Sequence, residues 1–318
     1  NIGLDLTILN GRLTFNADYY YKKTKNMLMN VSLPAGAAAA TSIARNEGEM
    51  VNKGFELSIS SKNLRGGAFT WDTDFNISFN RNKLTKLELQ KVYYDAKTAD
   101  VVNDYVVRNE PGRALGGFYG YISDGVDPET GELMYRDLNN DGKLDGNDAT
   151  RDLGYTDVPE YTAGLSAGFS WGKFDFSMQW TGAWNVDRML SEFRQPLGDT
   201  QNKGLLLYQY ENTWRSSEDT FTAKFPRITK SHSDNNYRGS DLYLMNASYL
   251  RLKNVEIGYN FDFPFMKKLK LTNCRMYVNG YNLLTFTGFK WGDPESRQSD
   301  RPNYPLTRVF NIGLKVGF

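Results

Sequence analysis

The stretch TRVFNIGLKVGF, residues 307–318, decides the fold, because it carries the chain to its end in strict alternation. Large apolar side chains occupy every second position, which is the pattern of a β-strand with one apolar and one polar-tolerant face. Soluble domains usually end in a frayed polar tail, whereas this chain ends on an aromatic residue in register with the apolar face: Phe310, Ile312, Leu314, Val316 and Phe318. The segment alone leaves two alternatives, a strand of a membrane barrel and an ordinary edge strand.

The composition excludes several classes of protein. The chain has 318 residues with 38 basic and 37 acidic side chains, and a net charge of +1 gives no reason to expect nucleic acid as a partner. Its mean hydropathy is -0.56, and no apolar run approaches the roughly 20 residues of a spanning helix. The single Cys274 excludes an internal disulfide and a cysteine metal cluster. Aromatic residues at 14% and 29 glycines favour β-structure with many turns, including membrane barrels.

The same alternation recurs along the chain and predicts nine strands, near residues 4–8, 13–22, 55–60, 71–80, 161–171, 174–181, 254–261, 271–281 and 307–318. Asn10-Gly11 between the first two is a strong hairpin signal. Leu250 and Leu252 have the wrong parity for the strand that follows, so we expect a β-bulge near Lys253. The sequence begins almost inside a strand without a signal peptide, and we therefore expect the C-terminal portion of a longer protein.

The predicted connections alternate between short and long. The short ones are Asn10-Gly11, 61–67, Gly172-Lys173 and about 262–268, all at the end of the sheet that carries Phe318. The long ones are 24–52, 82–158, 183–247 and 287–304. Transmembrane barrels have this asymmetry, with tight periplasmic turns and long extracellular loops. Nine strands cannot close alone, because bacterial barrels have even numbers of antiparallel strands, so we expect further strands upstream.

The polar side of each strand is rich in Asp, Asn, Ser, Thr and Gly, which suits a water-filled lumen and would make a poor protein core. We therefore predict an all-β fold, a transmembrane antiparallel β-barrel of which this chain supplies the last strands. The candidates for contact with a substrate in the lumen are Asp72, Asp74, Asn76, Asp175 and Gln179.

The segment DLNNDGKLDGND, residues 137–148, has the spacing of an EF-hand-type metal loop. Residues that can supply an oxygen ligand stand at its positions 1, 3, 5, 7, 9 and 12, and Gly142 stands at the sharp turn of position 6. The candidate ligands are Asp137, Asn139, Asp141, Lys143 through its carbonyl, Asp145 and Asp148. We expect Ca²⁺, or Mg²⁺ because Asp148 replaces the usual longer Glu, in a structural role. The alternative is an Asx-rich turn without an ion.

No catalytic residues are predicted, and we do not expect an enzyme. His232 is the single histidine and lies in a polar segment without the third group that a nucleophile triad needs. Four tryptophans lie in or near the long connections, where they could stack on sugars or pack a loop core: Trp180, Trp184, Trp214 and Trp291.

Several segments together resemble the SusC/RagA family of TonB-linked outer-membrane transporters. They are NEGEMVNKGFEL (46–57), NEPGRALGGFYGYISDGV (109–126), YRDLNNDGKLDGNDATRDLGYTDVPEYTAG (135–164), YLRLKNVEIGYN (249–260), NGYNLLTFTGFKWGDPE (279–295) and the terminal strand. Their order and approximate spacing agree with the family along nearly the whole chain.

The resemblance implies a barrel of about 22 strands, of which these would be the last nine, preceded by a plug and a segment that contacts TonB. It also implies a bacterial outer-membrane importer with a periplasmic C-terminus, a lipoprotein lid of the SusD type, outer-membrane lipid around it, and an oligosaccharide or peptide as cargo. Two alternatives remain open: a passive porin or surface adhesin barrel, and a soluble Ca²⁺-dependent carbohydrate-binding β-protein.

Overall fold

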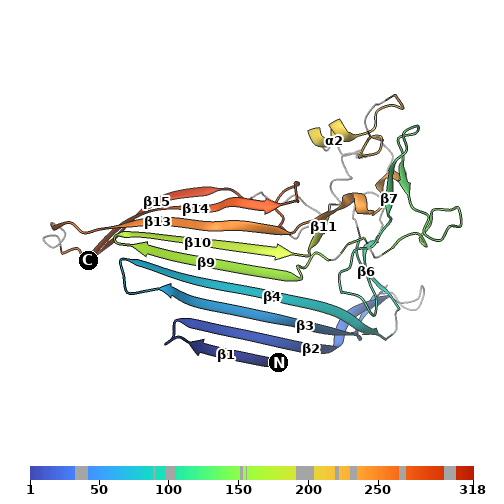
Figure 1. Cartoon of the computed structure of the whole chain (residues 1–318). Helices are drawn as coiled ribbons and strands as arrows, with labels where there is room; N and C mark the ends of the chain where they lie inside the picture. Colours follow the sequence, from blue (N-terminus) through green and yellow to red (C-terminus); the bar gives the residue numbers. More distant parts are fainter. Residues whose placement is uncertain are drawn as a thin grey trace.

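A single antiparallel sheet of nine strands organises the protein. The computed structural model describes residues 1–32, 42–88, 91–97, 105–150, 153–154, 156–190, 204–218, 222–229, 235–264, 270–296 and 306–318. The strands, in spatial order, are β1 (Ile2–Ile8), β2 (Leu13–Ser32), β3 (Ser42–Leu64), β4 (Phe69–Leu87), β9 (Tyr161–Trp171), β10 (Phe174–Trp184), β13 (Tyr249–Phe261), β14 (Asn273–Thr287) and β15 (Val309–Gly317). Each pairs with its neighbours in sequence order, and β1 and β15 form the two edges of a curved, open sheet (Figure 1).

The strand register keeps one polar and one apolar face continuous across the sheet, as predicted. Phe75 on β4 lies opposite Ile59 on β3 and Leu165 on β9. The next residue, Asp74, lies opposite Ser60 and Ser166 on the other face. On β15, Ile312 is 74% exposed, so no protein core covers this part of the apolar face. A sheet that leaves such side chains uncovered needs lipid or another apolar partner on that side.

Aromatic side chains mark both ends of the apolar face. Trp71 stacks on Phe169 near the short turns, with ring centroids 5.8 Å apart. Phe79 packs on Tyr161 at the opposite end, at 4.8 Å. Two such belts at the limits of an apolar band are typical of barrels whose strands cross a bilayer.

The predicted ends of the sheet for the connections are confirmed, but the strict alternation of their lengths is not: nine residues separate β2 from β3, and eleven separate β13 from β14. The short turns and the C-terminus lie at one end of the sheet, on the left in Figure 1, and the long connections rise from the other end. In the first hairpin Leu9, Asn10 and Gly11 all adopt positive φ, at 54°, 55° and 77°. The backbone N–H of Arg12 donates to the carbonyl of Leu9 at 3.2 Å and closes this turn. Asn and Gly reach this left-handed region at low cost, which is why the dipeptide signals a hairpin.

The bulge predicted near Lys253 is confirmed. The register of β13 against both β10 and β14 passes from Leu252 directly to Asn254, leaving Lys253 unpaired. The extra residue restores the parity of β13, so that Leu250 joins the apolar face and Arg251 the polar one.

The predicted loop at residues 24–52 is wrong. β2 continues to Ser32 and β3 begins at Ser42, so most of that range is strand. Likewise β4 runs to Leu87, and the first residues of the predicted loop 82–158 belong to it. Beyond the apolar band both faces of a strand can carry polar residues. The hydrogen bonds between the strands continue there, but the alternation of apolar and polar residues, which signals a strand in the sequence, stops.

Three of the long connections, which follow β4, β10 and β14, fold into one body at the end of the sheet, called here the loop assembly: the described residues of 88–160, 185–248 and 288–308. Its short elements are β5 (Tyr93–Lys97), β6 (Tyr105–Asn109), β7 (Ser123–Val126), β8 (Leu133–Tyr135), β11 (Asp187–Met189), α2 (Leu207–Asn212), η2 (Asn235–Tyr237), η3 (Asp241–Tyr243) and β12 (Leu244–Asn246). In the described part of the chain, no helix has the length and apolar character to cross a bilayer.

Two clusters of buried apolar side chains form the core of the loop assembly. The larger contains Val106, Phe118, Met189, Phe225, Tyr237 and Tyr243. The smaller contains Val186, Ala247 and Phe289, and Leu190 and Trp291 pack against both. All three long connections contribute to these clusters, so the loops stabilise one another through a shared hydrophobic core.

Candidate functional site

The three lumen candidates on β4 lie in a row on the polar face. Asp72 forms an ion pair with Arg65 at 3.1 Å near the short turns. Asp74 accepts a hydrogen bond from the Ser60 hydroxyl at 2.6 Å. Asn76 lies opposite Gly164, and its amide occupies the space that a Cβ at Gly164 would need. Asp72, Asp74 and Asn76 therefore line the polar face without converging on one point, as expected of residues along the wall of a water-filled lumen.

The two candidates on β10 have different surroundings. Gln179 is exposed and lies opposite Ser166 and Asn254. Asp175 is part of a charged cluster, because the Arg275 guanidinium on β14 binds its carboxylate with two nitrogens. Arg275 also donates to Glu256 on β13 at 2.7 Å. The structure therefore does not join Gln179 to the cluster around Asp175.

Amide side chains extend this charged cluster toward the edge of the sheet. Asn260 donates to Asp175 at 3.0 Å, and Asn279 donates to Glu256 at 3.3 Å. The Asn311 side chain on β15 then donates to the side-chain oxygen of Asn279 at 2.9 Å. The polar contacts thus connect four neighbouring strands, β10, β13, β14 and β15, and present both charges and amides on one face.

Sequence reasoning found Asp175 but missed Arg275, which lies 100 residues away in the chain. One signal was present. Gly258 stands on the polar face between them, since it pairs with Asp175 on one side and Tyr277 on the other. A Cβ at Gly258 would overlap the Arg275 guanidinium. A glycine inside a strand often marks such a close approach.

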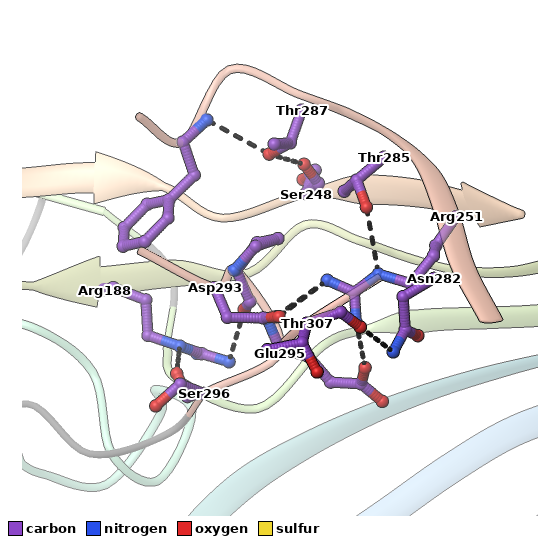
Figure 2. A network of polar contacts seen from close by, with 12 residues as sticks. Arg188, Ser248, Arg251, Asn282, Thr285, Thr287, Asp293, Glu295, Ser296 and Thr307 are labelled. Carbon is purple, nitrogen blue, oxygen red and sulfur yellow. Dashed lines mark hydrogen bonds and ion pairs between the residues drawn. The ribbon is translucent and has the colours of Figure 1, made fainter. Parts of the chain in front are cut away.

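A buried arginine joins the sheet to the loop assembly. Arg251 on β13 is 2% exposed, and its guanidinium donates to both carboxylate oxygens of Asp293, at 2.8 and 2.9 Å (Figure 2). It also donates to Glu295 at 2.8 Å and to the Thr285 hydroxyl at 3.1 Å. The remaining open side is covered by the ring of Tyr249, 5.3 Å from the guanidinium carbon. Each of the three guanidinium nitrogens of Arg251 therefore donates to Asp293, to Glu295 or to the neighbouring strand.

A second buried arginine holds the same segment from the other side. Arg188 on β11 donates to the backbone carbonyl of Ser296 at 2.7 Å (Figure 2). It also donates to the backbone carbonyl of Asp157 at 2.6 Å. Asp293 organises the turn itself, because its carboxylate accepts the backbone N–H of Glu295 at 2.8 Å. The segment 293–296 is thus fixed between the sheet and the first two long connections. We call Arg188, Arg251, Asp293 and Glu295 the arginine clamp; sequence analysis missed its charged contacts.

The predicted metal loop curls as its spacing requires, but its side chains bind backbone amides. Asp137 accepts the N–H groups of Asn140 at 2.7 Å and Gly142 at 2.8 Å. Asn139 accepts that of Asp141 at 3.0 Å. The two other acidic candidates behave similarly: Asp141 accepts the N–H of Lys143, and Asp145 that of Asn147. These are Asx turns.

Asp148, at the last position of the loop, is fully buried and accepts two backbone N–H groups. They belong to Asp145 at 2.8 Å and Leu138 at 2.9 Å. Hydrogen bonds to these amides, that of Asp145 first, hold the pKa of the Asp148 carboxyl below its ordinary value. Among the residues that the structure describes, no three His, Cys, Asp or Glu side chains gather closely enough to hold a metal ion. The residues as arranged do not form a ligand set, and metal binding stays a prediction.

The tryptophans divide between loop packing and the sheet. Trp291 packs on Tyr208, with centroids 4.7 Å apart, beside the core of the loop assembly. The Trp214 indole N–H donates to the Pro128 carbonyl at 2.9 Å. Trp180 stacks on Phe286 on the apolar face of the sheet, and Trp184 is 36% exposed. His232 lies outside the described residues.

Comparison with known proteins identifies the family. The family model described as TonB dependent receptor-like, beta-barrel, matches residues 1–283. TonB-dependent receptor P3 of Formosa agariphila is 30% identical over 351 residues, covering 100% of this chain and 34% of that protein. TonB-dependent receptor SusC of Bacteroides thetaiotaomicron is 30% identical over 329 residues, covering 100% of this chain and 31% of that protein. The chain thus spans about a third of the length of these curated relatives.

A solved structure, titled "Structure of the RagAB peptide transporter", has the same fold. It superposes with a TM-score of 0.78 at 24% identity, over 99% of this chain and 34% of that one. The fold of nearly the whole chain therefore has a counterpart in a solved structure. The chain belongs to the family of TonB-dependent receptor-like β-barrels, which are outer-membrane proteins, and is of the SusC/RagA type.

Proposed function

We propose that the full-length protein is an energised importer of the outer membrane, with this chain as the C-terminal part of its barrel. The short turns and the C-terminus lie in the periplasm, and the loop assembly lies outside the cell. TonB acts through a plug upstream of the residues described here. The names of the relatives, TonB-dependent receptors, support this assignment.

One observation carries the proposal: the polar face is continuous across all nine strands while the apolar face is left uncovered. Asp74, Asp175 and Asn311 share the polar face, and Ile312, at 74% exposure on β15, belongs to the other. Such a sheet separates lipid from water, and a barrel of this type encloses a hydrated path. A soluble Ca²⁺-dependent carbohydrate-binding protein would bury its apolar face.

We propose oligosaccharides or peptides as the cargo. The charged and amide groups around Asp175, Arg275 and Glu256 can exchange hydrogen bonds with hydroxyl or peptide groups. The neighbour titled as a peptide transporter favours peptides, and oligosaccharides stay open as the other cargo class that the family resemblance implies.

A lipoprotein lid of the SusD type is the proposed partner at the outer mouth. The helix α2 and the residue before it carry uncovered apolar side chains on the loop assembly: Leu206 is 46% exposed, Leu207 is 70% and Tyr210 is 54%. An exposed apolar patch of this kind on a protein surface marks a site of protein contact.

The test distinguishes TonB-dependent import of the cargo from passive diffusion through the barrel. The full-length protein is produced in a host from which it has been deleted, with and without a functional TonB, and uptake of fluorescent oligosaccharides and peptides is measured. Uptake that stops without TonB or after dissipation of the proton gradient supports import. Uptake that continues in both conditions identifies a passive porin, and no uptake with either probe favours an adhesin.

We also propose a structural Ca²⁺ ion in the loop 137–148, on the basis of its EF-hand spacing. Binding would require the carboxylates to turn away from the amides that they now accept. Calcium content of the purified full-length protein should fall after Asp141→Ala, whereas the control Asp124→Ala outside the loop should keep it. Equal calcium content in the two variants would contradict the site.

A further inference from the structure

A cavity of about 560 Å³ opens against β3 and β4 at the long-loop end of the sheet. Its lining includes four basic residues, Lys53, Arg81, Lys83 and Arg113, and no acidic residue. Tyr21 on β2 forms part of the wall. We call this cavity the basic cavity.

The strand register places the basic cavity on the apolar face. Lys53 pairs with Tyr21 on one side and Arg81 on the other. Phe55 lies two positions along β3 from Lys53, toward the short turns, and pairs with Phe79 on β4. Because positions two apart in a strand share a face, Lys53 and Arg81 lie on the same apolar face as these two phenylalanines. Tyr20 and Asn80, the residues just before Tyr21 and Arg81, lie on the opposite, polar face, where the Tyr20 hydroxyl donates to Asn80 at 3.0 Å. The lysines therefore point away from the lumen.

The height of the basic cavity matches a bilayer interface. Along β4 the apolar face runs from Phe69 to Phe79 and then changes at Arg81. Ten residues of strand span about 33 Å, which a tilt of about 40° reduces to about 25 Å across the membrane, the height of the apolar band of such barrels. Phe79 and Tyr161 form the aromatic belt at this level. The basic side chains thus stand where the headgroups of the surrounding lipid lie.

The charge of the basic cavity is only partly neutralised by the protein. Arg81 pairs with the buried carboxylate of Glu160. In the described part of the chain, neither the Lys53 nor the Lys83 ammonium has a carboxylate within ion-pair distance. The backbone holds Arg113 in place: Leu84 donates to its carbonyl at 2.8 Å, and Gly112 donates to the carbonyl of Leu84 at 2.7 Å.

We propose that the basic cavity binds the phosphate-bearing headgroup of a membrane lipid. Lys53 and Lys83 would bind the phosphate, and the acyl chains would follow the apolar face past Phe55 and Phe79. Basic pockets at the membrane interface recognise anionic headgroups in this way. The inference rests on the proposed function only in assigning the lipid to the outer leaflet; the chemistry follows from the cavity itself.

Lipid retention by the purified protein tests the proposal. Full-length protein in detergent is titrated with dioleoyl phosphatidic acid, and the bound lipid is counted by native mass spectrometry. Each lysine near a membrane surface contributes about 1 kcal/mol to binding an anionic lipid, so the double variant Lys53→Gln/Lys83→Gln should bind about thirtyfold more weakly. The matched control is Lys22→Gln, an exposed lysine that pairs with Asn52 on the polar face at the same height.

The other arms separate the possible sources of phosphate. Dioleoyl phosphatidylcholine should bind weakly to every variant, and millimolar inorganic phosphate should not displace phosphatidic acid. Equal binding of phosphatidic acid by the double variant and the Lys22→Gln control would overturn the proposal, as would displacement by inorganic phosphate alone. If the double variant fails to fold, as judged by heat-modifiable gel mobility, the two single variants are compared instead. The assay needs neither TonB nor cargo, so its result is independent of the transport test.

Discussion

Arg275 on β14 lies directly over Gly258 on β13 and thereby reaches Asp175 on β10 across an entire strand. The two residues are complementary in shape: the strand between the charges carries no side chain at the point where the guanidinium passes. The arrangement fixes the cluster around Asp175 on the polar face and makes Gly258 the position on which the cluster depends.

Substitution Gly258→Val should therefore displace Arg275 from Asp175 and Glu256. Because a hydrogen bond to a charged group contributes about 1.5–3 kcal/mol, we expect the barrel to unfold more easily by a few kcal/mol in a denaturant titration of the full-length protein.

The matched control for this variant is Gly168→Val, on the same polar face. A Cβ at Gly168 would meet no atom within 4 Å, so this substitution should leave unfolding unchanged. Equal loss of stability in the two variants would show that the cost comes from strand geometry and not from the displaced arginine.

The faces of the sheet could be predicted from the sequence because they follow from a local period of two. The bulge at Lys253 is an example, since it was visible as a parity error between Leu252 and Asn254. The extensions of β2 to Ser32 and of β4 to Leu87 were not visible, because strands beyond the bilayer have no apolar face to alternate.

Contacts between distant positions could not be predicted either. Arg251 and Asp293 are 42 residues apart, and nothing local to either residue specifies the other. The candidate lumen residues were recognisable by their face, but their partners depend on which strands are neighbours and in what register. That information lies in the pairing of whole strands, so only the structure supplies it.

Loss of the central residue of the arginine clamp should loosen the third long connection. Arg251→Met removes the partner of Asp293 and Glu295, and breaking a buried ion pair by removing one partner costs about 3–5 kcal/mol. We expect the segment around Asp293 to gain fast hydrogen exchange while the strands below keep their protection.

The variant Arg251→Lys serves as the control for charge. It keeps one positive charge but cannot bind both carboxylate oxygens of Asp293 as the guanidinium does. Exchange should therefore be intermediate. Exchange in Arg251→Met that matched the unsubstituted protein would show that the hydrophobic core, not the clamp, holds this segment.

In calcium-free protein, acidification should open the loop 137–148. Backbone hydrogen bonds from Asp145 and Leu138 lower the pKa of Asp148 below the ordinary 3.8. A carboxyl whose pKa is lowered by folding stabilises the folded loop above the ordinary value, and this contribution is lost as the pH falls through the lowered pKa. The amides of residues 138 and 145 should be protected from exchange at neutral pH and lose protection only below about 3.8.

The variant Asp148→Asn tests the cause of this pH dependence. Its side chain has one oxygen to accept hydrogen bonds in place of two, so one of the amides of Leu138 and Asp145 would face an N–H group. We expect reduced protection at neutral pH and no further change on acidification. A variant that kept the acid transition of the unsubstituted protein would assign that transition to another carboxylate.

The apolar patch on α2 should contribute to binding of the lipoprotein lid. Leu207 is 70% and Tyr210 is 54% exposed, and burying such side chains contributes about 1.5–3 kcal/mol each. The double variant Leu207→Asp/Tyr210→Asp should therefore lower the amount of lid protein that co-purifies with the full-length receptor at least tenfold. The control Leu9→Asp changes a residue of similar exposure, 66%, in a short turn at the opposite end of the sheet. Since a lid on the outer mouth cannot reach that turn, Leu9→Asp should keep the lid bound, and loss of the lid in both variants would place the contact elsewhere.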